Sequence, residues 1–207
     1  YTGKGIFKID NEPIKDGYGI FVYSNKDKYT GNFYDNKKSG RGKYLFNNGD
    51  LYIGSWFNDI LIGKCKINFA DGTTYYGEVY DYIMEGTGKY TYSNGYYYKG
   101  EFNSNLFYGK GILYNNNHHK VYSGNWKNGK YHGQGTLIWT NWDETSHKIT
   151  KEKYIGEFKD GEIYTEKRLN WELSEKDNEE DYKFKVISEF DYESVKSKFN
   201  FNKFLNL

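Results

Sequence analysis

Aromatic and polar residues alternate along most of this chain, and glycines interrupt the alternation at regular intervals. Successive side chains of a β-strand point to opposite faces, so a Tyr-x-Gly-x-aromatic step predicts a strand with the tyrosine, the glycine and the second ring on one face. The copies of this step begin at Tyr29, Tyr52, Tyr98, Tyr122 and Tyr154, and a sixth copy at Tyr75 has Val79 in place of the second ring.

A second pattern, Gly-x-Gly, runs in step with the first. It occurs at 17/19, 40/42, 86/88, 109/111 and 133/135, while at 63/65 the second glycine is replaced by Cys65. Glycines 31, 54, 77 and 100 are each 23 residues apart, and a fixed period of this size predicts a repeat protein. Asn48-Gly49, Asp71-Gly72 and Asn94-Gly95 follow the same period and predict type I′ hairpin turns.

Each unit therefore predicts a strand, a loop, a second strand and a tight turn. Where the glycine rows of neighbouring strands coincide, rings from one strand lie over bare backbone of the next, which explains glycine in the middle of strands. The expected fold is all-β: an elongated, single-layer, twisted antiparallel sheet of tandem hairpins. The repeats cover residues 1–163, and the longer segment 141–153 is expected to be a surface loop.

From residue 164 the repeat pattern stops, and residues 164–207 form a separate C-terminal segment that is rich in charge. Ser174 or Asp177 is a candidate N-cap for a helix that reaches Lys185, and Asp191 for a second helix. We expect a helical cap over the last repeat; the alternative is an amphipathic helix that binds a partner or a second copy.

The amino-acid composition limits the classes of core, ligand and cellular location that fit this chain. Aromatic residues make up 21% of the 207 residues, so rings must supply most of the buried apolar area. The net charge of +1 gives no electrostatic case for nucleic acid. A single cysteine excludes an intrachain disulfide and fits a reducing, cytoplasmic location. The abundance of Asn, Lys and Tyr is typical of an AT-rich genome, such as a protist's.

No motif predicts catalysis. The Gly-x-Gly steps lack the third glycine of a nucleotide-binding loop, and no Gly-Lys-Ser/Thr step is present. The four histidines have no metal-ligand spacing with Cys65. We therefore expect a protein that is not an enzyme and has no cofactor and no metal.

The repeated unit resembles the MORN repeat. The best copy runs from Tyr122 through Trp126 to the His132-Gly133 step and Gly135. The resemblance implies a scaffold or adaptor that binds protein partners at cytoskeletal or membrane-associated structures, and in some members a homodimer. It also leaves open a regulatory segment of a larger kinase or lysine methyltransferase. The chain departs from the repeat at Cys65, Val79 and Asn105-Leu106.

Two sets of candidate binding residues follow. The first is the row of rings on the glycine-bearing face, where exposed aromatic surface is typical of a protein interface: Tyr29, Phe33, Tyr52, Trp56, Tyr98, Phe102, Tyr122 and Trp126. The second set is basic and is the alternative, a contact with anionic phospholipid: Lys37, Lys38, Arg41, Lys43, Lys148, Lys151 and Lys153.

Overall fold

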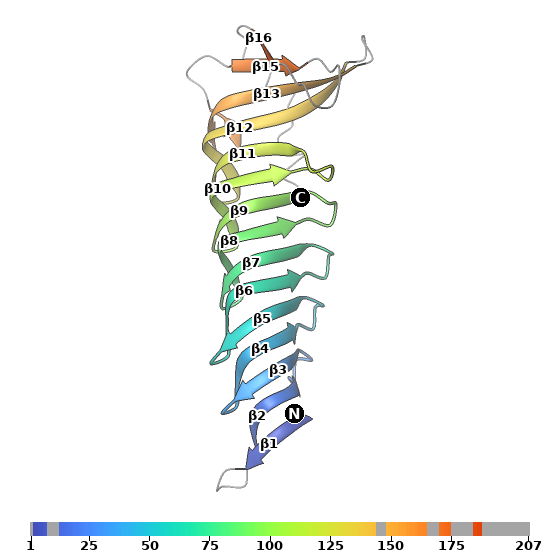
Figure 1. The fold of residues 1–207 in the computed structure, drawn as a ribbon, viewed down its shortest axis with the longest axis vertical. Coiled ribbons are helices and arrows are strands. Elements are labelled where there is room, and N and C mark those ends of the chain that lie inside the picture. The colour runs from blue at the N-terminus through green and yellow to red at the C-terminus, as the bar shows by residue number, and fades with distance from the viewer. Residues whose placement is uncertain (1, 8–12, 144–147, 165–169, 175–183, 188–207) are drawn as a thin grey trace. The chain divides into compact units, whose positions relative to one another are not determined.

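A computed structural model describes residues 2–7, 13–143, 148–164, 170–174 and 184–187. The chain divides into two compact units, Tyr1–Leu106 and Phe107–Leu207. In both units the described residues form β-strands and turns and include no helix, as the all-β prediction requires (Figure 1).

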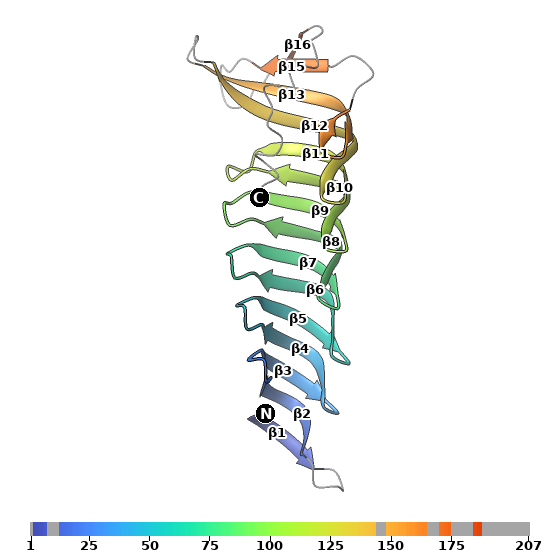
Figure 2. The ribbon, with the colours of Figure 1, turned by 180° about the vertical axis from the view of Figure 1, so that it is seen from behind.

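The first unit is an open antiparallel sheet in which each strand pairs with the next along the chain. Figures 1 and 2 show these hairpins from opposite sides. Its strands are β1 (Thr2–Phe7), β2 (Pro13–Val22), β3 (Lys28–Tyr34), β4 (Lys37–Leu45), β5 (Leu51–Phe57), β6 (Ile60–Asn68), β7 (Thr74–Tyr80), β8 (Ile83–Thr91) and β9 (Tyr97–Asn103).

The second unit is built in the same way, and β12 and β13 are its longest strands. Strands β10 to β13 pair in chain order, β13 also pairs with both β14 and β15, and β15 pairs with β16. Their bounds are β10 (Leu106–Tyr114), β11 (Lys120–Lys127), β12 (Lys130–Asp143), β13 (Lys148–Lys159), β14 (Glu162–Ile163), β15 (Asn170–Ser174) and β16 (Phe184–Ile187).

The strand register aligns the glycines, as the sequence pattern predicts. Gly42 of β4 lies opposite Gly31 of β3 on one side and Gly54 of β5 on the other, and Gly88 of β8 lies between Gly77 and Gly100. These rows leave a strip of bare backbone on one face of the sheet. We call this face, which carries Tyr29, Tyr44 and Trp56, the ring face, and the opposite one the outer face.

A β-bulge bends the second strand in four of the repeats, at β4, β6, β8 and β12. The register between β3 and β4 shifts between Gly31 and Phe33, and Gly40 in the bulged stretch has a φ of +65°. A bulge bends its strand, and beyond the bend Phe33 and Trp56 lie against the ring of Tyr29, with centroids 5.0 and 5.3 Å away. The bend thus produces a buried core on one side of a single sheet.

The two ends of the hairpins use different turns, and the predicted type I′ turns at Asn-Gly and Asp-Gly are wrong. At Asn48-Gly49 only the glycine has positive φ, and Gly49 N–H donates to Phe46 O, which describes a three-residue loop closed by a left-handed residue. The two-residue turns with positive φ at both positions lie at the other end, at Asp35-Asn36 and Asn58-Asp59 among others. Local composition identified the turns but not their geometry.

Two further predictions, both near the C-terminus, differ from the structure. The expected surface loop over 141–153 is instead mostly hairpin, because β12 and β13 pair as far as Asp143 and Lys148. The helix expected to reach Lys185 is wrong where the structure describes it, since Phe184–Ile187 is strand β16. Strand β15 pairs with β13 at the edge of the sheet. This pairing satisfies backbone N–H and C=O groups of β13 that a helix packed at the edge would leave unpaired. The second predicted helix, from Asp191, lies outside the described residues.

Candidate partner-binding site

Seven of the eight predicted anchor rings are buried in the core. Tyr29, Tyr98 and Tyr122 have no exposed surface, and Trp56 is 2% exposed. Phe33, Phe102 and Trp126 are also buried. These seven are core residues and not surface anchors, because the bends in the repeats cover them. Only Tyr52 remains half-exposed on the ring face.

The buried tyrosines reach across the glycine row and satisfy their own hydroxyls. Tyr29, Tyr75 and Tyr122 each donate a hydrogen bond to the carbonyl oxygen three residues on, at 3.0, 2.7 and 2.8 Å. Burial raises the pKa of all three hydroxyls, so they stay neutral donors. Because the ring needs bare backbone beneath it, the glycines are explained by packing.

Tyr52 is different because the slot beneath it is filled. Cys65 stands at the position where other repeats have glycine, and a Cβ built on Gly54 would meet Cys65 Sγ at 3.4 Å and Leu61 Cδ1 at 2.8 Å. Cys65 and Leu61 are fully buried. The ring of Tyr52 lies instead near Phe46 and Phe69, with centroids 5.2 and 6.4 Å away. A small change in one slot thus turns a core ring toward the surface.

A cluster of half-buried rings gathers around Tyr52. Tyr82 lies 5.5 Å from both Phe46 and Tyr52, and Phe69 lies 6.1 Å from Tyr90. We call Phe46, Tyr52, Phe69, Tyr82 and Tyr90 the ring cluster; each is half-buried. All five lie in the first unit. The ring cluster is thus a partly exposed aromatic part of the ring face.

Tyr82 is the member that the sequence pattern did not reveal. It occupies the second position of a tight turn with a φ of +68°, where Asn, Asp or Gly is usual and an aromatic residue is strained. The ring of Tyr82 packs against Trp56 and Tyr44, with centroids 5.6 and 5.8 Å away, and these contacts offset the strain. The sequence does contain a signal for this position, because Asp81-Tyr82 aligns with Asn58-Asp59, the turn of the preceding repeat.

Lys38 lies beneath the ring cluster and not on the surface, so its prediction as a lipid-contacting residue is wrong. Its side chain is 8% exposed, and Nζ lies 4.7 and 4.8 Å from the ring centroids of Trp56 and Tyr44. Nζ also donates a hydrogen bond to the Tyr82 hydroxyl at 3.4 Å. The position faces Phe33 in register, as Leu61 faces Trp56 in the next repeat. Burial lowers the pKa of Lys38.

A buried carboxylate closes the other end of the same repeat. Asp27 accepts hydrogen bonds from the Tyr44 hydroxyl at 2.9 Å, from the Asn25 amide at 2.8 Å and from Asn47 N–H at 2.8 Å. Burial raises the pKa of this carboxyl, but the three donors outweigh it and the pKa is lowered overall. Asp27 therefore joins two successive loops, which is a structural role.

The remaining basic candidates do not form one surface. Lys37 is exposed beside a tight turn, whereas Arg41 and Lys43 lie on the outer face. Lys151 and Lys153 lie half-buried in β13, with Lys153 opposite Glu172 of β15. The side chain of Lys148 lies outside the described residues.

Among the residues that the structure describes, no group of three His, Cys, Asp or Glu side chains is placed to hold a metal ion. The described part of the chain contains no helix with the length and apolar character needed to cross a bilayer.

Antiparallel hairpins stacked in series, with rings packed over aligned glycines on one face, define a hairpin-repeat protein. The chain belongs to the MORN-repeat family: the family model described as MORN repeat matches residues 14–28, 29–51, 52–74, 75–95, 98–119 and 122–144, which together exceed half of the 207 residues. Five of the matched segments begin at the buried or displaced tyrosines Tyr29, Tyr52, Tyr75, Tyr98 and Tyr122. A comparison with curated proteins found no match.

Proposed function

We propose that this protein is a non-catalytic scaffold that binds a partner polypeptide through the ring cluster of the first unit. The observation that carries the proposal is the displacement of Tyr52 by Cys65, which together with Tyr82 places half-buried rings where the repeats otherwise bury them. Partly buried, preordered rings are the residues that anchor protein interfaces. A cytoplasmic scaffold at cytoskeletal or membrane-associated structures is consistent with membership of the MORN family.

Pre-organisation supports this proposal. Tyr82 makes edge-on contacts with Tyr44 and Trp56 at 5.8 and 5.6 Å, so its ring is oriented before any partner arrives. Tyr44 and Trp56 are themselves buried. A rigid ring costs little conformational entropy on binding, which favours affinity. From beneath these rings, Lys38 Nζ donates a hydrogen bond to the Tyr82 hydroxyl and helps to hold the ring in place.

The test uses the double substitution Tyr52→Ala/Tyr82→Asn. Asn is a residue that the turn at position 82 favours, so this variant should fold. The matched control, Tyr34→Ala/Tyr80→Ala, removes two tyrosines that are 70% and 60% exposed elsewhere. Linear peptides are selected from a random library on the full chain, and their affinities for the three proteins are measured by fluorescence anisotropy.

We expect the selected peptides to bind the parent chain and the control within about twofold, and the ring-cluster variant at least tenfold more weakly, since one anchor contributes 2 kcal/mol or more by rough estimate. Circular dichroism and urea unfolding establish that each variant is folded. Equal binding by all three proteins, or no enrichment of any peptide, would contradict the proposal.

A further inference from the structure

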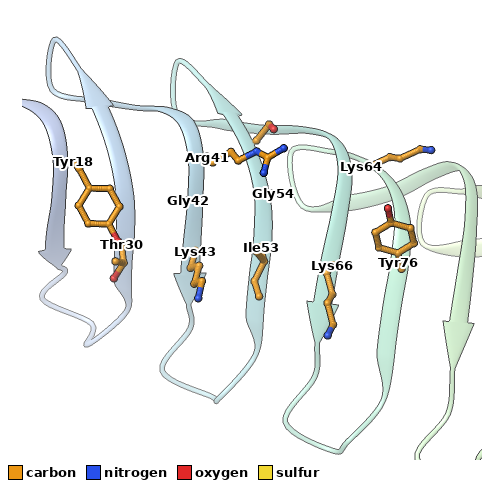
Figure 3. A pocket seen from close by; sticks show the side chains of 11 residues that line it. Tyr18, Thr30, Arg41, Gly42, Lys43, Ile53, Gly54, Lys64, Lys66 and Tyr76 are labelled. Atoms are coloured by element: carbon orange, nitrogen blue, oxygen red, sulfur yellow. The ribbon is translucent and has the colours of Figure 1, made fainter.

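The outer face of the first unit carries a hollow lined by positive charge. It has a volume of about 570 Å³ and is lined by Arg41 and Lys43 of β4 and by Lys64 and Lys66 of β6 (Figure 3). Ile53 of β5 lies between the two pairs, opposite Lys43 on one side and Lys66 on the other. The hollow is on the opposite face from the ring cluster, so it is a separate surface.

Turn chemistry explains why this hollow is basic although the chain is almost neutral. Aspartates are used at the ends of the strands, where their carboxylates accept backbone N–H groups: Asp50 from Ala70 at 2.9 Å, Asp59 from Lys38 at 2.8 Å and Asp71 from Thr73 at 2.8 Å. These three aspartates therefore lie at or beside turns, whereas Arg41, Lys43, Lys64 and Lys66 lie within strands β4 and β6. The charge is separated by position and not by overall composition.

The four cations have no carboxylate partner within ion-pair distance among the described residues. Glu78 of β7 lies opposite Lys64 in register. Its carboxylate instead accepts hydrogen bonds from the Thr87 hydroxyl at 2.7 Å and from Thr87 N–H at 3.3 Å. These bonds from Thr87 lower the pKa of Glu78, with a smaller contribution from Lys64. The hollow therefore presents positive charge that an external anion can neutralise.

The cations lie in two pairs on either side of β5. Lys43 and Lys66 face each other across Ile53, and Arg41 and Lys64 lie two residues further along their strands, where the register of β5 with β6 shifts between Ile53 and Ser55. Residues two apart on one strand, such as Lys43 and Arg41, are about 6.7 Å apart along it, and strands β4 and β6 are separated by about 10 Å across β5. An extended polypeptide has the same spacing of about 6.7 Å between alternate residues, and its side chains point alternately to its two sides. Laid along β5, it directs successive carboxylates to β4 and to β6 in turn.

We propose that this hollow binds an extended acidic polypeptide segment that runs along β5, with at least four consecutive or near-consecutive Asp or Glu residues. The backbone of the segment lies over Ile53, Gly54 and Ser55, of which Ile53 offers an apolar contact and Ser55 a short side chain. Each carboxylate pairs with one of Arg41, Lys43, Lys64 and Lys66. The exposed rings of Tyr18 and Tyr76 line the hollow as well, at 65% and 58% exposure, and limit its width.

Two other classes of polyanion fit this geometry less well. A single nucleic-acid strand carries its phosphates along one backbone line and engages one row of cations rather than two rows 10 Å apart. A membrane presents a plane of headgroups and favours cations that protrude from a flat or convex surface. Both are included in the test as competing ligands.

The experiment measures binding of a fluorescein-labelled peptide of eight glutamates to the full chain by anisotropy, with eight glutamines as the neutral peptide. The hollow is reversed in charge by Lys43→Glu/Lys66→Glu. The matched control, Lys28→Glu/Lys37→Glu, makes the same change in net charge at exposed lysines that do not line the hollow. We expect at least a tenfold loss of glutamate-peptide affinity in the hollow variant and less than twofold in the control, with weakening at higher salt.

Equal losses in the two variants would overturn the proposal, because binding would then depend on net charge alone. Tighter binding of oligouridylate, or of vesicles containing phosphatidylserine, with the same dependence on Lys43 and Lys66, would assign the hollow to nucleic acid or to membrane instead. The ring-cluster variant Tyr52→Ala/Tyr82→Asn should retain glutamate-peptide binding, so failure of one proposal leaves the other distinguishable.

Discussion

Gly42→Ala tests the contact of a ring with bare backbone that the repeat depends on. A Cβ added at Gly42 would lie 2.5 Å from Cε2 and Cζ of Tyr29 and closer still to its hydroxyl oxygen, whereas ordinary contact begins at 3.4 Å. Tyr29 is fully buried, so its ring can yield only by displacing Phe33 or Trp56 or by leaving the core. The sequence contains a precedent, because Cys65 fills the equivalent slot and Tyr52 is displaced.

The magnitude combines three effects. Overpacking of a core costs about 1–3 kcal/mol, and loss of the hydrogen bond from the Tyr29 hydroxyl to Asn32 O costs about 0.5–1.5 kcal/mol. Replacing glycine by alanine in a strand returns about 0.5–1 kcal/mol. We therefore expect the free energy of unfolding to fall by about 2 kcal/mol.

Urea unfolding followed by tryptophan fluorescence measures this change, since Trp56 packs on Tyr29. For a urea dependence of about 2 kcal/mol per molar, the midpoint should fall by about 1 M. A double-mutant cycle with Tyr29→Leu isolates the contact: without the phenol ring, Gly42→Ala should be neutral or stabilising. The same loss in both backgrounds, or a loss below about 0.5 kcal/mol in the parent, would refute the account of the glycine rows.

Three more predictions follow from buried groups. Burial raises the pKa of Tyr52 and of Tyr92 to about 12, against about 10 in the unfolded chain. The stability that their neutral hydroxyls contribute is therefore complete below pH 10 and is lost as the pH rises from 10 to 12. Urea midpoints that stay constant across that range would contradict this. Burial raises the pKa of the Cys65 thiol to about 11, so iodoacetamide at pH 8 should modify it at least 100-fold more slowly in the native chain than in urea, as mass spectrometry can measure. Lys38→Met places an apolar side chain where the next repeats have Leu61 and Met84, and we expect it to raise the free energy of unfolding by about 1 kcal/mol. A decrease would show that the contacts of the ammonium with Trp56 and Tyr44 contribute more than its burial costs.

The period of 23 residues was enough to predict the hairpins, their antiparallel pairing and the alignment of Gly31, Gly42 and Gly54, because side-chain alternation and repeat spacing are local properties of the chain. The tyrosine and glycine positions also carried the family resemblance that the MORN match confirms. The geometry of the turns was not accessible in the same way. The φ angles at Asn48-Gly49 depend on how the flanking strands pair, and the positive φ at Tyr82 contradicts local preference.

Tertiary packing decided which rings are exposed. The bulge near Gly40 covers Phe33 and Trp56, so a row of rings that alternation assigns to one face becomes core. Tyr52 escapes only because Cys65, 13 residues away in the next strand, fills its slot. Arg41, Lys43, Lys64 and Lys66 are two distant pairs in the chain, and only strand pairing through β5 brings them around one hollow. Residue type and spacing act along the chain, whereas exposure and charge clustering depend on which strands become neighbours.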